Sequence, residues 1–317
     1  MRIEDSFGSA LRRDEPLGKH ANYRIGGPAD YYLEVATPEA ASGAIRAARE
    51  DHLPIFVLGG GSNILISDAG FRGLVLVYTG RGTTIEGERV IADAGAITAG
   101  VAKRTAQAGL TGFEWAVGVP GTIGGAARGN AGCFGGETRE ATDSIEAVSL
   151  TTGERRTFMR EDCGFAYRES RFKREPWLIV RVTLALAAGD RSRALAAVTG
   201  YLEERKGKQP LEYSSAGCIF KNFEFTDPAE LPSRVRELVP REFLEARRIP
   251  AGWLIDRAEL KGKRIGDAMV SDTHGNFFVN AGSATAEQVV QLISFAKMKV
   301  RDLFGVQLME EIQYVGF

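Results

Sequence analysis

The sequence predicts an α+β fold, because strand and helix patterns are mixed along the chain without the strict alternation of a doubly wound parallel sheet. A helix start is indicated at Thr37-Pro38, where an N-cap residue precedes a proline at the first helical position. Short apolar runs bounded by glycine and polar residues are typical of strands. The 38 glycines gather in a few loops, which indicates backbone that closely approaches a ligand.

The elements follow in order along the chain. We predict strands at residues 29–36, 54–58, 74–78, 90–94, 144–150, 177–186 and 311–315. We predict helices at residues 37–50, 98–108, 190–206 and 285–303. The last helix has capping-box spacing between Thr285 and Gln288. Residues 1–16 are predicted to be irregular, 214–218 to form a loop, and 223–248 to be a partly helical insertion.

Composition excludes several classes of protein. The 317 residues, 44% of them hydrophobic, are enough for two or three domains with real cores. The 40 basic and 41 acidic residues nearly cancel, so no overall field attracts nucleic acid or an anionic membrane. No apolar run is long enough to span a bilayer, and residues 1–13 lack a signal-peptide core. We therefore expect a cytoplasmic protein that neither binds nucleic acid nor inserts into a membrane.

The cysteines predict neither disulfides nor metal. Cys133, Cys163 and Cys218 are odd in number and far apart, which argues against a disulfide framework and a zinc site. Only three histidines are present, and none has the spacing of a metal ligand. We predict no bound metal.

Two glycine-rich loops are the clearest binding signals. Gly59-Gly60-Gly61-Ser62-Asn63 follows a predicted strand, and small residues there expose N–H groups that can hold phosphate oxygens. A plain tight turn is the alternative for this loop alone. The second loop, 118–136, contains Pro120-Gly121-Thr122-Ile123-Gly124-Gly125, where dense glycine beside apolar residues favours a flat or phosphorylated ligand. Neither loop has the GxGxxG pattern, so a Rossmann dinucleotide site is disfavoured.

These motifs resemble those of a known family. VLGGGSN at 57–63, VPGTIGG at 119–125 and YRIGGPA at 23–29 resemble the FAD-binding fold of the vanillyl-alcohol-oxidase type. YRESRFK at 167–173, AGCIFKN at 216–222, AGWLI at 251–255 and the terminal 308–316 segment narrow the resemblance. In this order, they are similar to the UDP-N-acetylenolpyruvoylglucosamine reductases, also called UDP-N-acetylmuramate dehydrogenases. The short segment between Leu186 and Asp190 resembles the second, short-loop type of that family.

The resemblance implies an activity. Members reduce UDP-N-acetylglucosamine enolpyruvate to UDP-N-acetylmuramate in peptidoglycan precursor synthesis, with non-covalent FAD and with NADPH as co-substrate. Hydride passes from the reduced flavin to the terminal enolpyruvyl carbon, and the neighbouring carbon takes a proton. The resemblance further implies a monomer with FAD-binding lobes at 1–56 and 57–188, an α+β substrate-binding cap domain at 189–302, and a C-terminal strand segment at 303–317 that returns to the FAD-binding region.

Catalytic residues follow from the resemblance. Arg168 matches the family's catalytic arginine, and a guanidinium can hold a carboxylate through two hydrogen bonds. Cys218 stands where most members carry a proton-donating serine. A thiol with its ordinary pKa of about 8.5 is mostly protonated at neutral pH and can donate to a carbanion-like carbon. An inert buried cysteine is the alternative, and Ser214 or Ser215 would then donate.

A terminal glutamate completes this set. Glu311 matches the family glutamate, because its register to Ile312 and Gly316 selects it over Glu310. In a strand, neighbouring side chains point to opposite faces, so solvent exposure is expected for one of the two glutamates and not for both.

Binding residues are implied in the same way. The residues expected to bind the cofactor are Arg24, Gly59, Gly60, Gly61, Ser62, Asn63, Pro120, Gly121, Thr122, Gly124 and Gly125. Those expected to bind the UDP moiety are Arg205, Lys208, Lys221 and Asn222, for which a solvated surface is the alternative. His274 aligns with a recurring family histidine and has either a structural or a ligand-binding role. Two rival functions stay open: an oxidase with the same FAD-binding fold, and a non-enzymatic UDP-sugar-binding module.

Overall fold

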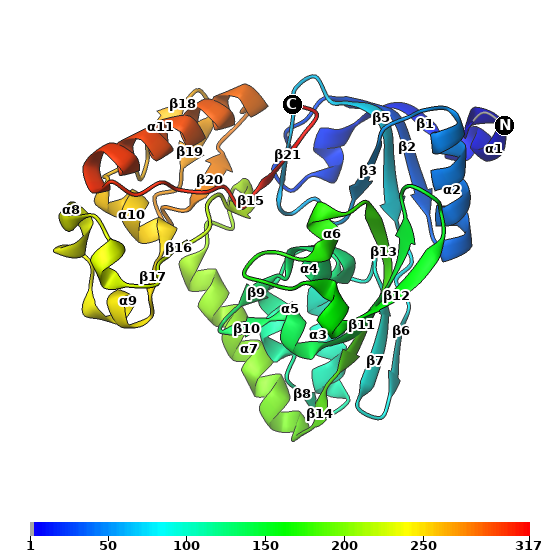
Figure 1. Cartoon of the computed structure of the whole chain (residues 1–317), viewed down its shortest axis with the longest axis horizontal. Coiled ribbons are helices and arrows are strands. Elements are labelled where there is room, and N and C mark those ends of the chain that lie inside the picture. The colour runs from blue at the N-terminus through cyan, green and yellow to red at the C-terminus, as the bar shows by residue number, and fades with distance from the viewer. Residues whose placement is uncertain (1–2) are drawn as a thin grey trace. The chain divides into compact units, whose positions relative to one another are not determined.

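The computed structural model describes residues 3–317, which form two compact units (Figure 1). The first unit contains the chain up to Glu15, residues 29–60 and residues 71–207. The second contains residues 16–28, 61–70 and 208–317. The mixture of helices and largely antiparallel sheets confirms the predicted α+β class. The division into segments 1–56, 57–188, 189–302 and 303–317 stays a prediction.

The first sheet of the first unit carries the glycine-rich loop at its end. Its strand order is β1 (Arg12–Pro16), β2 (Pro28–Val35), β5 (Phe71–Tyr78) and β3 (Ile55–Leu58). β5 runs parallel to both β2 and β3. Between β2 and β3 lies the predicted helix, α2 (Pro38–Glu50), whose N-cap Thr37 accepts a hydrogen bond of 3.2 Å from the Ala40 N–H. Gly59 and Gly60 follow β3 directly.

The second sheet of this unit is antiparallel and supports the second glycine-rich loop. Its order is β12 (Arg155–Met159), β11 (Thr142–Ser149), β13 (Trp177–Ala185), β7 (Arg89–Asp93) and β6 (Thr83–Glu86). The helix α4 (Ile123–Gly129) packs against β7 and β13. The other elements of the unit are α1 (Ile3–Phe7), η1 (Gly8–Ala10), α3 (Thr98–Gln107), β8 (Leu110–Thr111), η3 (Glu114–Gly118), β9 (Gly132–Cys133), β10 (Gly136–Glu137), α5 (Thr138–Ala141), η4 (Arg160–Cys163), α6 (Arg171–Arg174), β14 (Ala187–Ala188) and α7 (Arg191–Lys208).

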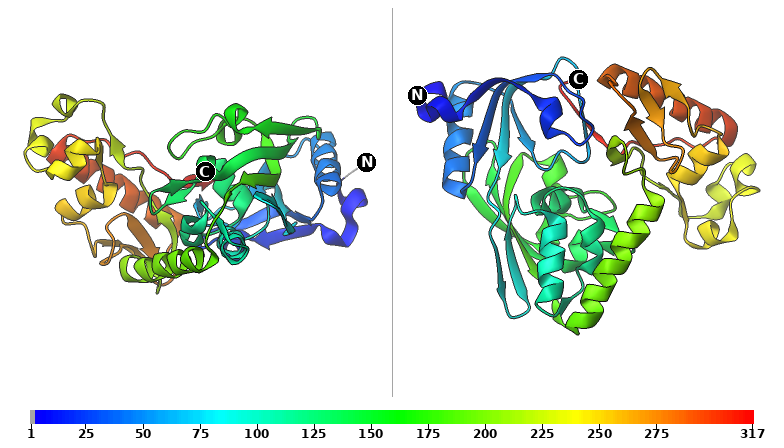
Figure 2. Two further views of the ribbon diagram at one scale, coloured as in Figure 1. Left: turned by 90° about the horizontal axis from the view of Figure 1, so that it is seen from below. Right: turned by 180° about the vertical axis from the view of Figure 1, so that it is seen from behind.

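The second unit has its own core around a four-stranded sheet. The order is β15 (Ser214–Cys218), β20 (Phe277–Asn280), β19 (Ala268–Val270) and β18 (Arg264–Ile265). The long helix α11 (Ala286–Phe304) packs against β18 and β19 (Figure 2). Its buried residues include Val289, Leu292, Ile293, Ala296 and Val300, the three-and-four spacing of one helix face. The predicted capping box of Thr285 and Gln288 is present.

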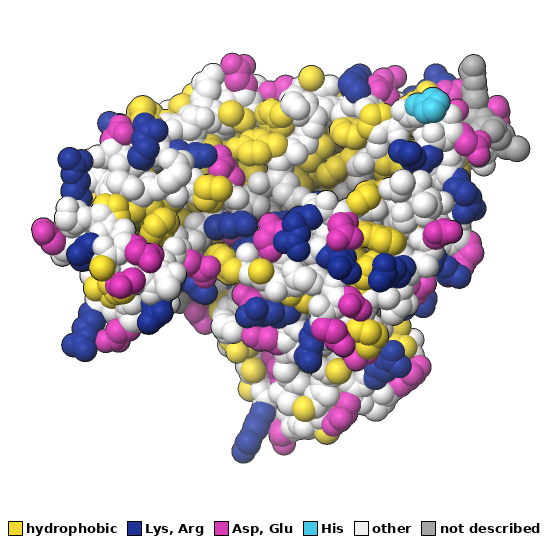
Figure 3. All heavy atoms as spheres, viewed as in Figure 1, with side chains coloured by type: hydrophobic (Ala, Val, Ile, Leu, Met, Phe, Trp, Pro, Cys, Tyr) yellow, Lys and Arg dark blue, Asp and Glu magenta, His cyan; other side chains and the backbone are white. Residues whose placement is uncertain are grey.

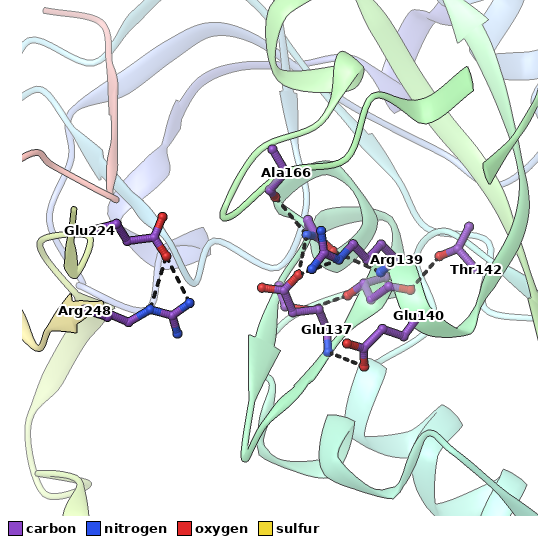
Figure 4. A network of polar contacts seen from close by, with 10 residues as sticks. Glu137, Arg139, Glu140, Thr142, Ala166, Glu224 and Arg248 are labelled. Atoms are coloured by element: carbon purple, nitrogen blue, oxygen red, sulfur yellow. Dashed lines mark hydrogen bonds and ion pairs between the residues drawn. The ribbon is translucent and has the colours of Figure 1, made fainter. Parts of the chain in front are cut away.

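Shorter elements complete the second unit. The predicted insertion forms β16 (Phe223–Glu224), η5 (Pro228–Glu230), α8 (Ser233–Arg236), α9 (Arg241–Glu245) and β17 (Arg248–Ile249), followed by α10 (Ala251–Arg257). An ion pair of 2.9 Å between Arg248 and Glu224 joins β17 to β16 (Figure 4). Earlier segments supply η2 (Leu17–His20) and β4 (Ile64–Ile66), and β4 pairs in parallel with the terminal β21 (Gln313–Val315).

Two predictions of local structure are wrong. Residues 3–16 are not irregular, because they form α1, η1 and the edge strand β1, whose polar, mostly exposed side chains give no strand signal. Residues 214–218 are a strand and not a loop. Glycine and serine disguise this strand, which pairs with β20 around a register shift at Gly217, where φ is 78°.

The surface agrees with the nearly balanced charge. Figure 3 shows Lys and Arg side chains interspersed with Asp and Glu over the face in view. Within residues 3–317, every helix is too short or too polar to cross a membrane. The same residues contain no group of three or more His, Cys, Asp or Glu side chains that could hold a metal ion.

Candidate functional site

The two glycine-rich loops meet backbone to backbone in the first unit. A Cβ atom added to Gly60 would lie 2.5 Å from the Cα of Gly121 and 3.2 Å from the nitrogen of Thr122. A Cβ atom added to Gly59 would lie 3.2 Å from the Thr122 hydroxyl oxygen. The close approach of the second loop therefore requires glycine at position 60. This steric requirement explains why glycine stands there in the first loop.

The start of α4 is fixed by the same contacts. The Thr122 hydroxyl accepts a hydrogen bond of 3.3 Å from the Gly125 N–H and so caps the helix. A Cβ atom added to Gly124 would lie 2.7 Å from the Cβ of Ala94, whereas Gly125 is exposed. A helix start with exposed, side-chain-free backbone can accept the diphosphate of a dinucleotide. These residues therefore fit the diphosphate of the predicted FAD, and the contact of each of them with the cofactor stays a prediction.

The rest of the first glycine motif belongs to the second unit. Gly61 has a φ of 63°, and an added Cβ atom would lie 2.1 Å from the carbonyl oxygen of His20. The side chain of Asn63 donates a hydrogen bond of 3.2 Å to the carbonyl oxygen of Glu311. Arg24 also has a left-handed φ, 58°, and its guanidinium donates to the Lys19 carbonyl oxygen at 3.2 Å. Asn63 therefore joins the predicted cofactor loop to the predicted catalytic segment.

Arg168 stands on a loop that several hydrogen bonds hold in place. Its φ of 54° is left-handed, and its Nη2 donates to the carbonyl oxygen of Gly132 at 2.8 Å. The buried Asn130 donates to the Ala166 carbonyl oxygen at 2.8 Å, within the polar network drawn in Figure 4. The Ser170 hydroxyl donates to the carbonyl oxygen of Arg128 at 2.6 Å. The position of the guanidinium is thus determined by the end of α4 and the strand that follows it.

Two predicted functional arginines lie near one cysteine of the first unit. Burial raises the pKa of the Cys133 thiol to about 11, while the guanidinium groups of Arg168 and Arg205 act in the opposite direction. The neighbouring Phe134 stacks on Tyr201 of α7 with ring centroids 4.7 Å apart. The structure therefore brings Arg168 and Arg205 into one region. The side chain of Lys208 lies outside the part that the structure describes.

In the second unit, the segments of Cys218 and Glu311 are joined through main-chain hydrogen bonds. Cys218 is half-buried at the end of β15. The carbonyl oxygen of the next residue, Ile219, accepts a hydrogen bond of 2.7 Å from the Glu311 N–H. The Lys221 N–H donates to the Met309 carbonyl oxygen at 2.8 Å. The segment that follows Cys218 is thus hydrogen-bonded to the segment that contains Glu311, although the two residues come from separate motifs.

The two terminal glutamates have different surroundings. The Glu310 carboxylate accepts hydrogen bonds from Lys297 of α11 at 2.8 and 3.0 Å. Both glutamates are half-buried, so neither is exposed to solvent as one of them was expected to be. The ion pair gives Glu310 a structural role, and the choice of Glu311 as the reactive residue stays a prediction.

Asn222 has a contact that the sequence did not predict. Its side-chain oxygen accepts a hydrogen bond of 3.1 Å from the Ala251 N–H at the start of α10. Asn222 therefore stabilises a helix end, and its contact with substrate stays a prediction, as does that of Lys221.

Sequence reasoning missed Asn276. This asparagine is 3% exposed, and its side chain bonds both main-chain polar groups of Phe220, close to Cys218. Its N–H donates to the Nδ1 of His274 at 3.2 Å, and burial lowers the pKa of that histidine. In the sequence, Asn276 is only a polar residue before a short apolar run, which identifies no partner by itself.

Comparisons with known proteins match both the N-terminal and the C-terminal part of the chain. Residues 209–315 match the family model of the UDP-N-acetylenolpyruvoylglucosamine reductase C-terminal domain, and residues 29–158 match an FAD binding domain. The chain is 38% identical to the UDP-N-acetylenolpyruvoylglucosamine reductase of Solibacter usitatus, over the full length of both. It is 36% identical to that of Carboxydothermus hydrogenoformans, covering 98% of this chain and 95% of the relative.

A solved structure is similar throughout. The crystal structure of UDP-N-acetylenolpyruvylglucosamine reductase from Thermus caldophilus aligns with a TM-score of 0.75 at 31% identity, covering 96% of this chain and 98% of that one. Together with the two family models, this confirms the predicted fold class, an FAD-binding region followed by a separate C-terminal domain.

Proposed function

The chain belongs to the UDP-N-acetylenolpyruvoylglucosamine reductase family and carries its FAD-binding domain, and from this premise we propose the reaction in detail. It reduces the enolpyruvyl double bond of UDP-N-acetylglucosamine enolpyruvate to give UDP-N-acetylmuramate, with NADPH as the reductant. It works as a monomer in the cytoplasm. FAD, which the glycine-rich loops at 59–63 and 120–125 would hold, would supply hydride-transfer chemistry between NADPH and the enolpyruvyl group.

Arg168 binds the carboxylate of the enolpyruvyl group. As hydride arrives at the terminal carbon, negative charge builds on the neighbouring carbon and its carboxylate, and a fixed cation stabilises that charge. The hydrogen bond of 2.8 Å from Arg168 to Gly132 supports this role, because it orients the guanidinium before substrate binds. Arg205, Lys208 and Lys221 bind the UDP moiety.

Cys218 supplies the proton. The thiol transfers a proton from Sγ to the carbon beside the carboxylate, and the thiolate is later reprotonated from water. Glu311 is the polar side chain that accompanies Cys218 at the reacting carbon. The observation that carries the proposal is the hydrogen bond of 2.7 Å from the Glu311 N–H to the Ile219 carbonyl, since it holds Glu311 against the residue that follows Cys218.

Anaerobic half-reactions test the proposal. NADPH should bleach the flavin absorbance of the purified protein, and UDP-N-acetylglucosamine enolpyruvate should restore it. Cys218→Ala should leave bleaching by NADPH unchanged and slow the restoration about 10²-fold or more. Cys218→Ser should keep substantial activity, because a hydroxyl can donate at the same position.

The outcomes separate the rivals. If the enolpyruvyl substrate restores the flavin absorbance of Cys218→Ala at the normal rate, Cys218 is not the proton donor. Ser214 or Ser215 would then be the donor. A flavin that NADPH reduces but the enolpyruvyl substrate does not reoxidise would favour an oxidase. Protein that takes up no FAD would refute the proposed reaction altogether and favour a UDP-sugar-binding module.

A further inference from the structure

One buried side chain holds the main chain that follows Cys218. The Asn276 side-chain oxygen accepts a hydrogen bond of 3.0 Å from the Phe220 N–H, and its side-chain nitrogen donates to the Phe220 carbonyl oxygen at 2.8 Å. Its main-chain carbonyl accepts a hydrogen bond of 2.9 Å from the Ile219 N–H. Asn276 thus makes three hydrogen bonds to two consecutive residues.

The same two residues also contact the Glu311 segment. The Ile219 carbonyl accepts the Glu311 N–H at 2.7 Å, and Phe220 forms an isolated bridge with Glu310. Asn276 therefore lies on one side of the Ile219–Phe220 main chain and the terminal segment on the other. A displacement of Phe220 would move Cys218 and Glu311 together.

We propose that Asn276 is a positioning residue that sets the placement of Cys218 and Glu311 for proton transfer. This rests on the roles given to those residues above. Asn276 acts through the Ile219–Phe220 main chain and does not contact substrate.

The chemistry of the contact explains why an amide is needed. Asn276 and Phe220 are 3% and 1% exposed, so water does not replace a lost hydrogen bond. One planar group must both accept from an N–H and donate to a C=O, as a partner strand would. An apolar side chain would leave both Phe220 groups buried without partners. An ionised carboxylate would accept but not donate, and it would face the carbonyl oxygen of Phe220.

Asn276→Asp separates positioning from simple loss of structure. A protonated carboxyl has one acceptor and one donor, so it reproduces the contacts of the amide, whereas the carboxylate does not. Burial beside a carbonyl oxygen raises the pKa of the introduced carboxyl. The variant should therefore behave like the wild type at low pH and lose the contact to the Phe220 carbonyl as pH rises.

The expected readout is a split between the two half-reactions. At about pH 8, flavin reduction by NADPH should match the wild type, and reoxidation by UDP-N-acetylglucosamine enolpyruvate should be about 10-fold to 10²-fold slower. Most of that loss should disappear at about pH 6. The reoxidation rate of the wild type is measured over the same pH range, because His274 titrates beside Asn276. Lys261 and Asp256 both act on the pKa of this histidine.

Asn280→Asp is the matched control. Asn280 is the last residue of β20, the strand that directly follows Asn276; it is 8% exposed, and its side chain also bonds only main-chain groups, those of Tyr23, Gly282 and Ala284. The same substitution there should lower stability without a selective effect on reoxidation. Asn276→Gln is the second variant, since it keeps donor and acceptor but shifts Phe220, and it should slow reoxidation at every pH.

Three results would decide the matter. If Asn276→Asp and Asn276→Gln reoxidise at the wild-type rate at about pH 8, Asn276 does not position the site. An equal loss in Asn280→Asp would reduce the effect to general destabilisation and overturn the proposal. Failure of the wild type to be reoxidised by the enolpyruvyl substrate would instead refute the proposed function, and the wild-type trace reveals that separately.

Discussion

Replacing Gly60 by alanine tests whether the close approach of the two glycine-rich loops holds the FAD-binding region together. Gly60 is not in the left-handed region of φ, so alanine meets no backbone strain there, and the effect is purely steric. The added Cβ atom would lie 2.5 Å from the Cα of Gly121. Because the neighbour is backbone, it cannot turn away as the end of a flexible side chain could.

The cost follows from the overlap. Carbon atoms in contact prefer separations of about 3.5–4.0 Å, so the loops must part by about 1 Å. The Gly121 carbonyl accepts hydrogen bonds from the N–H and hydroxyl of Thr98 at 3.0 and 3.3 Å, which resist that movement. Overpacking of this kind costs about 3 kcal/mol, the upper end of its usual range. For a unit of this size, that lowers Tm by about 6–12 °C.

Thermal unfolding without FAD, followed by FAD titration monitored by flavin fluorescence, measures both consequences. Gly60→Ala should lower Tm and weaken FAD binding, since the displaced segment includes the N-cap Thr122. Gly43→Ala is the control, because Gly43 lies in α2 of the same unit with nothing within 4 Å of an added Cβ atom. There alanine should raise stability by about 0.5–1 kcal/mol. Wild-type Tm and FAD affinity in Gly60→Ala would refute the reasoning.

Two titratable groups give further predictions. With a pKa raised by burial to about 11, Cys133 should react with iodoacetamide at about pH 8 roughly 10-fold to 10²-fold slower than free cysteine, and peptide mass spectrometry will follow it. A rate equal to that of free cysteine would contradict the burial. Because burial lowers the pKa of folded His274, the unfolded state binds more protons below about pH 6.5, and stability falls as pH drops through that value. In urea unfolding, His274→Gln should show a shallower fall, and an unchanged slope would exclude His274 as its cause.

Local signals explain why some elements were predictable. Residues 285–303 carry their own start, a threonine and glutamine three apart, and their own period, so the observed α11 differs by only one residue at each end. The strand predicted at 177–186 is an apolar run buried on both faces, and β13 covers Trp177–Ala185. Neither prediction needed knowledge of a partner elsewhere in the chain.

Elements and contacts that depend on a distant partner were not predictable. β15 lacks β-branched and aromatic residues, and its strand conformation comes from pairing with β20. In the candidate site, the glycine-dense loops could be predicted, because two backbone segments that approach closely leave little room for any residue other than glycine. Asn276 was not, since an asparagine acquires its role only from Phe220, 56 residues away.

The parallel pairing of β4 with β21 has a consequence for biosynthesis. Asn63 and its hydrogen-bond partner Glu311 are separated by 248 positions, so β4 leaves the ribosome long before its partner exists. At ordinary rates of translation, that interval is on the order of tens of seconds. The folded second unit buries the three side chains of β4 almost fully, those of Ile64, Leu65 and Ile66. Until β21 has been synthesised, these apolar residues lack their partner strand. The nascent chain therefore has a period of vulnerability to aggregation that ends only when the last strand docks, and molecular chaperones can protect this segment until then.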